Sequence, residues 1–193
     1  MTRIIGIAGS LRQGSYNAAL LRNAVELAPA GCSLEIATIK DIPLYDGDLE
    51  TQHGIPAAVA ALKDRIAAAD GLLLVTPEYN NSIPGVFKNA VDWMTRPAAD
   101  IARVFGDRPV GLIGVTPGGM GTTFSQTAWL PVLRTLGTRP FFGKTLYVSG
   151  AAKVLDAEGR LTDKDLRERL RVYMEQFAAF VDSTRAATKP EQG

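Results

Sequence analysis

Serine, arginine and asparagine side chains gather in one short loop near the start of the chain. The stretch Gly9–Asn17 has the sequence GSLRQGSYN and directly follows a short run rich in isoleucine, RIIGIA. Glycine, serine and asparagine favour turns and helix N-caps, and a helical pattern begins at Ser15 or Asn17. Free main-chain N–H groups and the helix dipole make such a helix start an anion site. Two serine hydroxyls, an amide and the charge of Arg12 could therefore bind a phosphate here, although a capped helix start alone would account for Ser15 and Asn17.

Two further loops follow buried strands and suit a flat ligand. Gly71–Thr76 is almost wholly apolar, which is typical of a strand buried on both faces, and the polar stretch Pro77–Ser82 comes next. That stretch offers main-chain N–H groups and the ring of Tyr79. After the apolar run Val110–Val115, the stretch Thr116–Thr123 has the sequence TPGGMGTT, whose glycines let a planar ligand approach the main chain closely. One phosphate site and two walls for a planar heterocycle fit FMN.

The elements that would position these loops alternate between strand and helix patterns. We expect strands at 3–8, 33–39, 72–76 and 110–115, and a fifth within 139–148 that is interrupted at Gly143. Helices are expected from residue 15 or 17, near Pro56, over 84–94 and 124–136, and in a long last segment after Thr162, while 41–50 is expected to be a loop. Such alternation predicts a single α/β domain over residues 1–185, a flavodoxin-like doubly wound parallel sheet of five strands in the order 2-1-3-4-5 within a three-layer sandwich. Residues 186–193 are expected to form a frayed tail.

Composition narrows the function classes. The 193 residues carry a formal net charge of +1, with 46% hydrophobic and 21% charged residues, so no broad field favours nucleic acid or an anionic membrane. No apolar run is long enough to cross a bilayer. Cys32 is the only cysteine and His53 the only histidine, so neither a disulfide nor a metal site is expected. We expect a soluble cytoplasmic protein.

The motifs GSLRQGSYN and VTPEYNNSIPGVFKNAVDW, with IPLYDGDLE between them, resemble the NADPH-dependent FMN reductase family, a flavodoxin-like group that includes quinone, chromate and azo-dye reductases. The resemblance implies an enzyme that passes a hydride from NADPH or NADH through FMN to a quinone-like, azo, metal-ion or flavin acceptor. It implies a phosphate loop containing Ser10, Arg12, Ser15 and Asn17, and an isoalloxazine loop containing Pro77, Glu78, Tyr79 and Asn80. The complete set of predicted FMN-binding residues is Ser10, Leu11, Arg12, Ser15, Tyr16, Asn17, Pro77, Glu78, Tyr79, Asn80, Ser82, Thr116, Pro117, Gly118 and Gly119.

No catalytic acid or base is predicted, because the redox chemistry would belong to the cofactor. Glu78 is interpreted as a loop residue that acts through its main chain or in a subunit contact. The resemblance also implies a homodimer or a tetramer made of two dimers. Apolar residues lie almost all round the helix 84–94, so we expect one face of it to form a subunit interface. Trp93 on this helix belongs either to the core or to that interface, and the resemblance favours the interface.

Two other functions remain open on the sequence. An electron-transfer flavodoxin would share the fold and FMN but would take no hydride from NAD(P)H, and such proteins are usually strongly acidic. A non-catalytic flavin or quinone sensor that binds a partner protein is the other alternative. The acceptor and the choice between NADPH and NADH are also left open.

Overall fold

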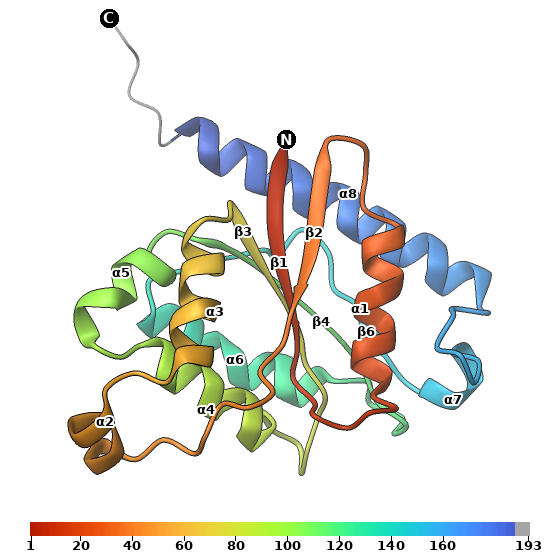
Figure 1. Cartoon of the computed structure of the whole chain (residues 1–193). Coiled ribbons are helices and arrows are strands. Elements are labelled where there is room, and N and C mark those ends of the chain that lie inside the picture. The colour runs from red at the N-terminus through yellow and green to blue at the C-terminus, as the bar shows by residue number, and fades with distance from the viewer. Residues whose placement is uncertain (188–193) are drawn as a thin grey trace, which may run out of the picture.

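The structure is a computed structural model that describes residues 1–187, with side chains to residue 185 (Figure 1). Strands and helices alternate along most of the chain. Their order is β1 (Thr2–Ala8), α1 (Tyr16–Glu26), β2 (Cys32–Ala37), α2 (Gly47–His53), α3 (Ala57–Ala67), β3 (Gly71–Val75), α4 (Gly85–Met94), η1 (Ala98–Asp100), α5 (Ile101–Val104), β4 (Pro109–Val115), α6 (Thr123–Thr135), β5 (Arg139–Pro140), β6 (Tyr147–Val148), α7 (Ala151–Val154) and α8 (Lys164–Ala187).

The strands form one parallel sheet in the order β2-β1-β3-β4-β5, which confirms the predicted flavodoxin-like topology. Side chains on a strand point alternately to its two faces. Leu73 and Val75 of β3 accordingly pack in the core beneath α1 and α8, whereas Leu72 and Leu74 pack in the core beneath α3, α4 and α6. Figure 1 shows α1 and α3 on opposite sides of β1 and β2. The result is the expected three-layer sandwich.

The fifth strand position is divided between β5 and β6, which both pair with β4. The predicted interruption within residues 139–148 is therefore confirmed. Between the two short strands the chain leaves the sheet edge, and Phe141 packs edge-on against Tyr173 of α8 with 5.4 Å between ring centroids. Its neighbour Phe142 is 71% exposed.

A short helix, α2, lies at the end of the segment 41–50 that was predicted to be a loop, and this prediction was wrong. Asp46 caps the helix, since its Oδ1 accepts a hydrogen bond of 2.8 Å from the N–H of Asp48. Asp48 and Glu50 also place negative charge in the first turn, where the helix dipole favours it. The composition of the segment, rich in Asp, Gly and Pro, resembles that of a loop and concealed these helix signals.

Segment 41–50 also covers the face of α4 that was expected to form a subunit interface. Trp93 is 1% exposed within the subunit, its Nε1 donates to the carbonyl of Pro43 at 2.9 Å, and its ring lies edge-on to Tyr45 at 4.9 Å. Asn89 donates to the same carbonyl at 2.8 Å and accepts from the N–H of Tyr45 at 2.8 Å. The placement of Trp93 in an interface was therefore wrong, because a distant segment of the same chain covers it.

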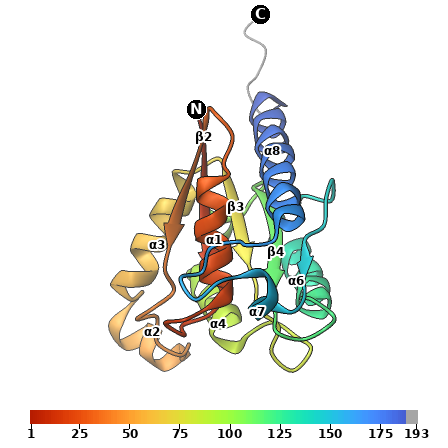
Figure 2. The same cartoon turned by 90° about the vertical axis from the view of Figure 1, so that its right-hand side faces the viewer.

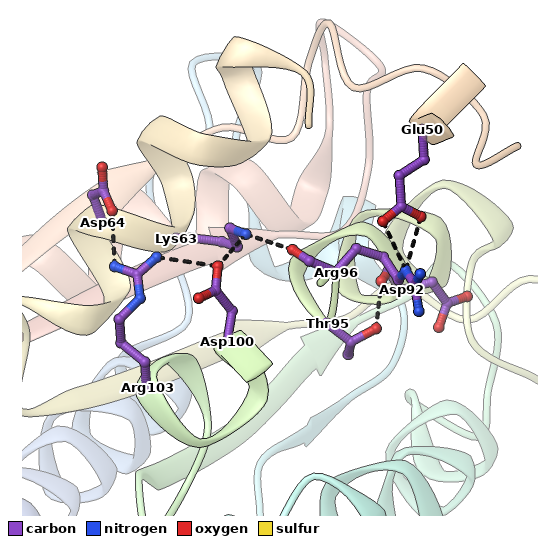
Figure 3. A network of polar contacts seen from close by, with 8 residues as sticks. All are labelled: Glu50, Lys63, Asp64, Asp92, Thr95, Arg96, Asp100 and Arg103. Carbon is purple, nitrogen blue, oxygen red and sulfur yellow. Dashed lines mark hydrogen bonds and ion pairs between the residues drawn. The ribbon is translucent and has the colours of Figure 1, made fainter. Parts of the chain in front are cut away.

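Charged side chains fasten α2 and α3 to the segment after α4 (Figure 3). The Nε of Arg96 donates to both carboxylate oxygens of Glu50, at 2.8 and 3.1 Å. Lys63, only 3% exposed, donates to the carbonyl of Arg96 and to Asp100, the latter at 2.6 Å. Arg103 pairs with Asp100 from the next turn. Lys63, the buried member of this cluster, is thus hydrogen-bonded, and the cluster holds α2 and α3 to the segment after α4.

The last helix, α8, packs Leu170, Tyr173 and Phe177 onto the sheet. It continues through residues 186 and 187, past the predicted domain boundary, while the rest of the predicted tail, 188–193, lies outside the described residues. The N-terminus and the end of α8 lie at the same end of the molecule, opposite the loops that follow β1, β3 and β4 (Figure 1, Figure 2). Across residues 1–187, no helix is long and apolar enough to span a membrane.

Candidate FMN site

A cavity of about 300 Å³ lies where the carboxyl ends of β1, β3 and β4 meet. In a doubly wound sheet, ligands bind at this edge. The loops predicted from the sequence converge on it. The cavity is lined by ten of the predicted residues, namely Ser10, Arg12, Ser15, Tyr16, Asn17, Pro77, Glu78, Tyr79, Thr116 and Pro117, together with Val115.

Five predicted residues do not line the cavity: Leu11, Asn80, Ser82, Gly118 and Gly119. Val115, which was not predicted, is the last residue of β4 and was assigned to the strand alone. The predicted strand 110–115 could have indicated Val115, because the last residue of a strand at this edge of the sheet lies next to the loop that lines the cavity.

The loop after β1 ends in a capped helix. Ser15 is the N-cap of α1, and its Oγ accepts from the N–H of Ala18 at 3.2 Å, which leaves the hydroxyl proton free to be donated. The guanidinium of Arg12 lies over the ring of Tyr16, 5.1 Å from its centroid. Charge, hydroxyl and helix N-terminus therefore occur together, as the anion site requires.

Asn17 does more for the scaffold than the sequence suggested. Its side-chain Nδ2 donates to the carbonyl of Val115 at 2.8 Å, and its Oδ1 accepts from the N–H of Val115 at 3.0 Å. The side chain is buried and joins the first turn of α1 to the end of β4. Both polar atoms of the Asn17 amide, which was predicted to bind a phosphate, are therefore also used in this structural bridge.

The loop after β3 is shaped by a tight turn. The main chains of Tyr79 and Ser82 exchange two hydrogen bonds of 3.1 and 3.0 Å, and Asn80 and Asn81 both have positive φ, 50° and 59°. Left-handed backbone at both central positions is typical of a type I′ turn, which asparagine tolerates. The turn keeps Tyr79 beside the cavity, 47% exposed, with its hydroxyl donating to Ser10 Oγ at 3.3 Å.

The loop after β4 is hydrogen-bonded to the end of β6 and to the segment that follows it. The N–H of Thr116 donates to Val148 at 2.9 Å, and its carbonyl accepts from Ala151 at 3.1 Å. Gly118 accepts from the N–H of Gly150 at 3.3 Å. These bonds hold Thr116 and Pro117 at the cavity, whereas Gly118 and Gly119 are exposed.

The main chain beneath the cavity is closely packed at Gly9. Gly9 ends the strand side of the first loop, and a Cβ there would lie 2.0 Å from the ring of Phe87, the first large apolar residue of α4. Phe87 in turn packs edge-on against Trp129 of α6, with 5.1 Å between centroids. The start of the first loop therefore packs against a buried aromatic pair.

The donor set fits FMN. The hydroxyls of Ser10 and Ser15, the Arg12 charge and the first turn of α1 suit a phosphate, and the Tyr79 ring and the Thr116–Pro117 main chain border the rest of the cavity. A cleft of this size falls at the lower end of small-molecule sites. The lining contains neither histidine nor cysteine, and Glu78 is its single carboxylate. Hydroxyl, guanidinium and main-chain groups that can bind and orient a redox cofactor make up most of its polar surface.

The comparisons with known proteins agree with this chemistry. The family described as NADPH-dependent FMN reductase matches residues 2–153. An NAD(P)H-dependent FMN reductase of Pseudomonas aeruginosa is 40% identical over 93% of this chain and 95% of its own length. A 2-hydroxy-1,4-benzoquinone reductase of a Burkholderia species is 37% identical over 95% and 98% of the two chains. The solved flavoenzyme NAD(P)H:(acceptor) oxidoreductase from Paracoccus denitrificans superposes with a TM-score of 0.85, at 32% identity over 95% of this chain and 99% of the other.

Proposed function

The chain belongs to the NADPH-dependent FMN reductase family and is therefore an FMN-using oxidoreductase with NAD(P)H as electron donor, and we propose that it reduces quinones at the cavity formed by its three loops. The observation that carries the proposal is that three loops line one cavity: the loop after β1, which suits a phosphate, and the loops after β3 and β4, which suit a planar ring. Bound FMN supplies the redox chemistry, by accepting a hydride and passing electrons on. The residues of this chain bind and orient the reactants.

Each loop has its own part in this proposal. Ser10, Ser15 and the first N–H groups of α1 hold the FMN phosphate, and Arg12 adds the positive charge that pairs with it. The wall from Pro77 to Tyr79 and the main chain at Thr116 and Pro117 border the ring. Exposed Leu11, Asn80, Ser82, Gly118 and Gly119 line the approach rather than the floor.

A quinone is the acceptor that the surroundings of the cavity favour. Leu11 and Met120, on the first and third loops, are 52% and 61% exposed and offer apolar contact to a flat, uncharged ring. The Burkholderia relative is a benzoquinone reductase by name, which supports the same choice. Azo compounds, metal ions and free flavin remain acceptors to be compared in the same assay.

An anaerobic titration followed by steady-state assays tests the proposal. The protein should bind one equivalent of FMN, and NADPH or NADH should bleach the flavin absorbance within the turnover time. Added benzoquinone should then restore the absorbance and sustain NAD(P)H oxidation. Bleaching by dithionite but by neither nucleotide would favour an electron-transfer flavodoxin, and FMN binding without turnover of any acceptor would favour a sensor.

We also propose that the chain assembles as a homodimer, with two dimers able to pair, and that it works in the cytoplasm, where NAD(P)H is regenerated. Support for assembly comes from apolar side chains on the segment that covers α4. Leu44 is 78% exposed and Leu49 40% exposed, beside an apolar cavity of about 230 Å³ that Pro43 and Trp93 line. A second subunit would cover this surface, which therefore replaces Trp93 as the place to test the interface.

A further inference from the structure

The N-terminus of α6 is capped by a residue from another loop. Its N-cap residue, Thr122, makes no side-chain capping bond, because the Thr122 hydroxyl instead accepts from Gln126 Nε2 at 2.8 Å. The N–H of Ser125 donates to Oε2 of Glu78 at 3.0 Å, across 47 positions of sequence. A residue of the second loop thus supplies the acceptor that a helix normally receives from its own N-cap.

A second contact joins the same helix turn to the same loop. Ser125 Oγ and Thr76 Oγ1 are hydrogen-bonded at 2.7 Å, and Trp129, one turn further along α6, donates its Nε1 to Thr76 Oγ1 at 3.1 Å. Thr76, Ser125 and Trp129 are all completely buried. The main chain from Thr76 to Glu78 is therefore held to α6 at both of its ends.

We propose that Glu78 is a positioning residue, whose carboxylate fixes the loop from Pro77 to Tyr79 against α6 so that this loop can border the flavin ring. The inference rests on the proposed function. A negative side chain at a helix N-terminus is favoured by the helix dipole as well as by the hydrogen bond. Because the Thr122 hydroxyl already accepts from Gln126, Glu78 is the acceptor for the Ser125 N–H, and the position of the loop depends on the reach of the Glu78 side chain.

Two conservative substitutions of Glu78 distinguish the effect of its side-chain length from the effect of its negative charge. Glu78→Gln keeps the length and an oxygen that can accept from Ser125, whereas Glu78→Asp keeps the charge on a side chain one methylene shorter. We expect Glu78→Asp to weaken FMN and riboflavin equally, by about tenfold, because the affected loop borders the ring and not the phosphate. Glu78→Gln should stay within about threefold of wild type for both ligands. The visible absorption spectrum of the bound flavin should change in the Asp variant only.

Thr138→Ala is the matched control. The Thr138 hydroxyl donates to the carbonyl of Leu133 at the opposite end of α6, so its loss should lower the melting temperature without changing either flavin affinity. If Glu78→Asp behaves like Thr138→Ala, the carboxylate is a structural cap and the inference is overturned. A Gln variant that binds flavin worse than the Asp variant would overturn it too, since charge would then matter more than reach. If wild-type protein binds neither flavin, the proposed function itself fails and the inference falls with it.

Discussion

Single side chains in the first loop combine two tasks, and Ser15 shows this most clearly. It caps α1 by accepting from Ala18, and it also lines the cavity that we assign to FMN, where its hydroxyl can donate to a ligand. The sequence motif predicted both tasks, because a serine before a helical pattern is a cap signal and a helix start is an anion site.

Ser15→Ala should separate them. The lost donor to a charged phosphate should weaken FMN by about one to two orders of magnitude, whereas riboflavin, which has no phosphate, should be nearly unaffected. The lost cap should lower the free energy of unfolding by about 1 kcal/mol in the absence of flavin. Flavin fluorescence titrations and urea denaturation measure the two effects, and an equal loss for both ligands would leave Ser15 with the capping task alone.

Gly9 and Gly14, in the same loop, differ in what surrounds them. A Cβ at Gly9 would meet the Phe87 ring at 2.0 Å, but a Cβ at Gly14 would meet only Arg12 Nη1, at 3.5 Å. Gly9→Ala should therefore destabilise the protein by about 1–3 kcal/mol through overpacking and should also weaken FMN binding. Gly14→Ala is the control and should match wild type in denaturation and titration, and equal tolerance of the two changes would disprove the close contact.

At the scale of elements, pairs of segments depend on bonds between distant residues. Asn17 and Val115 are 98 positions apart, and their two hydrogen bonds join α1 to β4 under the cavity. Asn17→Ala would leave a buried N–H and a buried carbonyl without their partners, which costs about 1–3 kcal/mol of unfolding free energy. Asn17→Asp should cost more, because one oxygen of its buried carboxylate would face the Val115 carbonyl oxygen in place of the lost donor. Urea unfolding of both variants checks the order, and a reversed order would contradict the bridge.

The attachment of α2 should depend on pH. The hydrogen bonds from Arg96 hold the pKa of Glu50 below its usual value. A carboxyl with a lowered pKa in the folded state contributes stability above its unfolded pKa of about 4.3 and loses it as pH falls through the folded pKa. Glu50→Gln should therefore lower the melting temperature at neutral pH and show a smaller further fall below about pH 4.3 than wild type does.

Glu158→Gln is a suitable control for that measurement. Glu158 forms an ion pair with Arg160, but both side chains are well exposed, at 65% and 70%, and exposed pairs contribute little. The control should follow the wild-type pH curve closely. If the Glu50 and Glu158 variants have the same acid profile, the contact between Glu50 and Arg96 does not stabilise α2.

The sequence predicted local patterns better than contacts between distant segments. Apolar runs, the glycines that end them and the N-cap at Ser15 are signals carried by neighbouring residues. The strand order and most of the cavity lining could therefore be predicted from them. The cover of Trp93 by Pro43 and the cap on α6 from Glu78 join residues that are 50 and 47 positions apart. Such contacts leave no periodic signal in either partner. Trp93, which the apolar helix pattern and the family resemblance together placed in an interface, is for this reason found inside the subunit.

For the whole molecule, the segment that covers α4 gives a test of assembly. Leu44 is 78% exposed, so Leu44→Asp should leave the subunit folded but convert dimers into monomers. Trp93→Glu, in contrast, would bury a charge within the subunit and should prevent folding. Light scattering after size-exclusion chromatography, with circular dichroism as the folding control, measures both. A Leu44→Asp variant that keeps the wild-type mass, or a wild type that is monomeric at micromolar concentration, would contradict this interface.

The N-terminus and the end of α8 lie at the end of the molecule opposite the loops that line the cavity (Figure 1, Figure 2). An electrode linker, an affinity surface or a second enzyme joined at the N-terminus or beyond α8 would therefore leave the mouth of the cavity open to dissolved reactants. The protein should accept such attachment with its turnover intact, while the same cargo inserted at the Asn80–Asn81 turn would block the entrance. The location of the termini and the cavity at opposite ends of the molecule makes the chain suitable for use as an immobilised reductase.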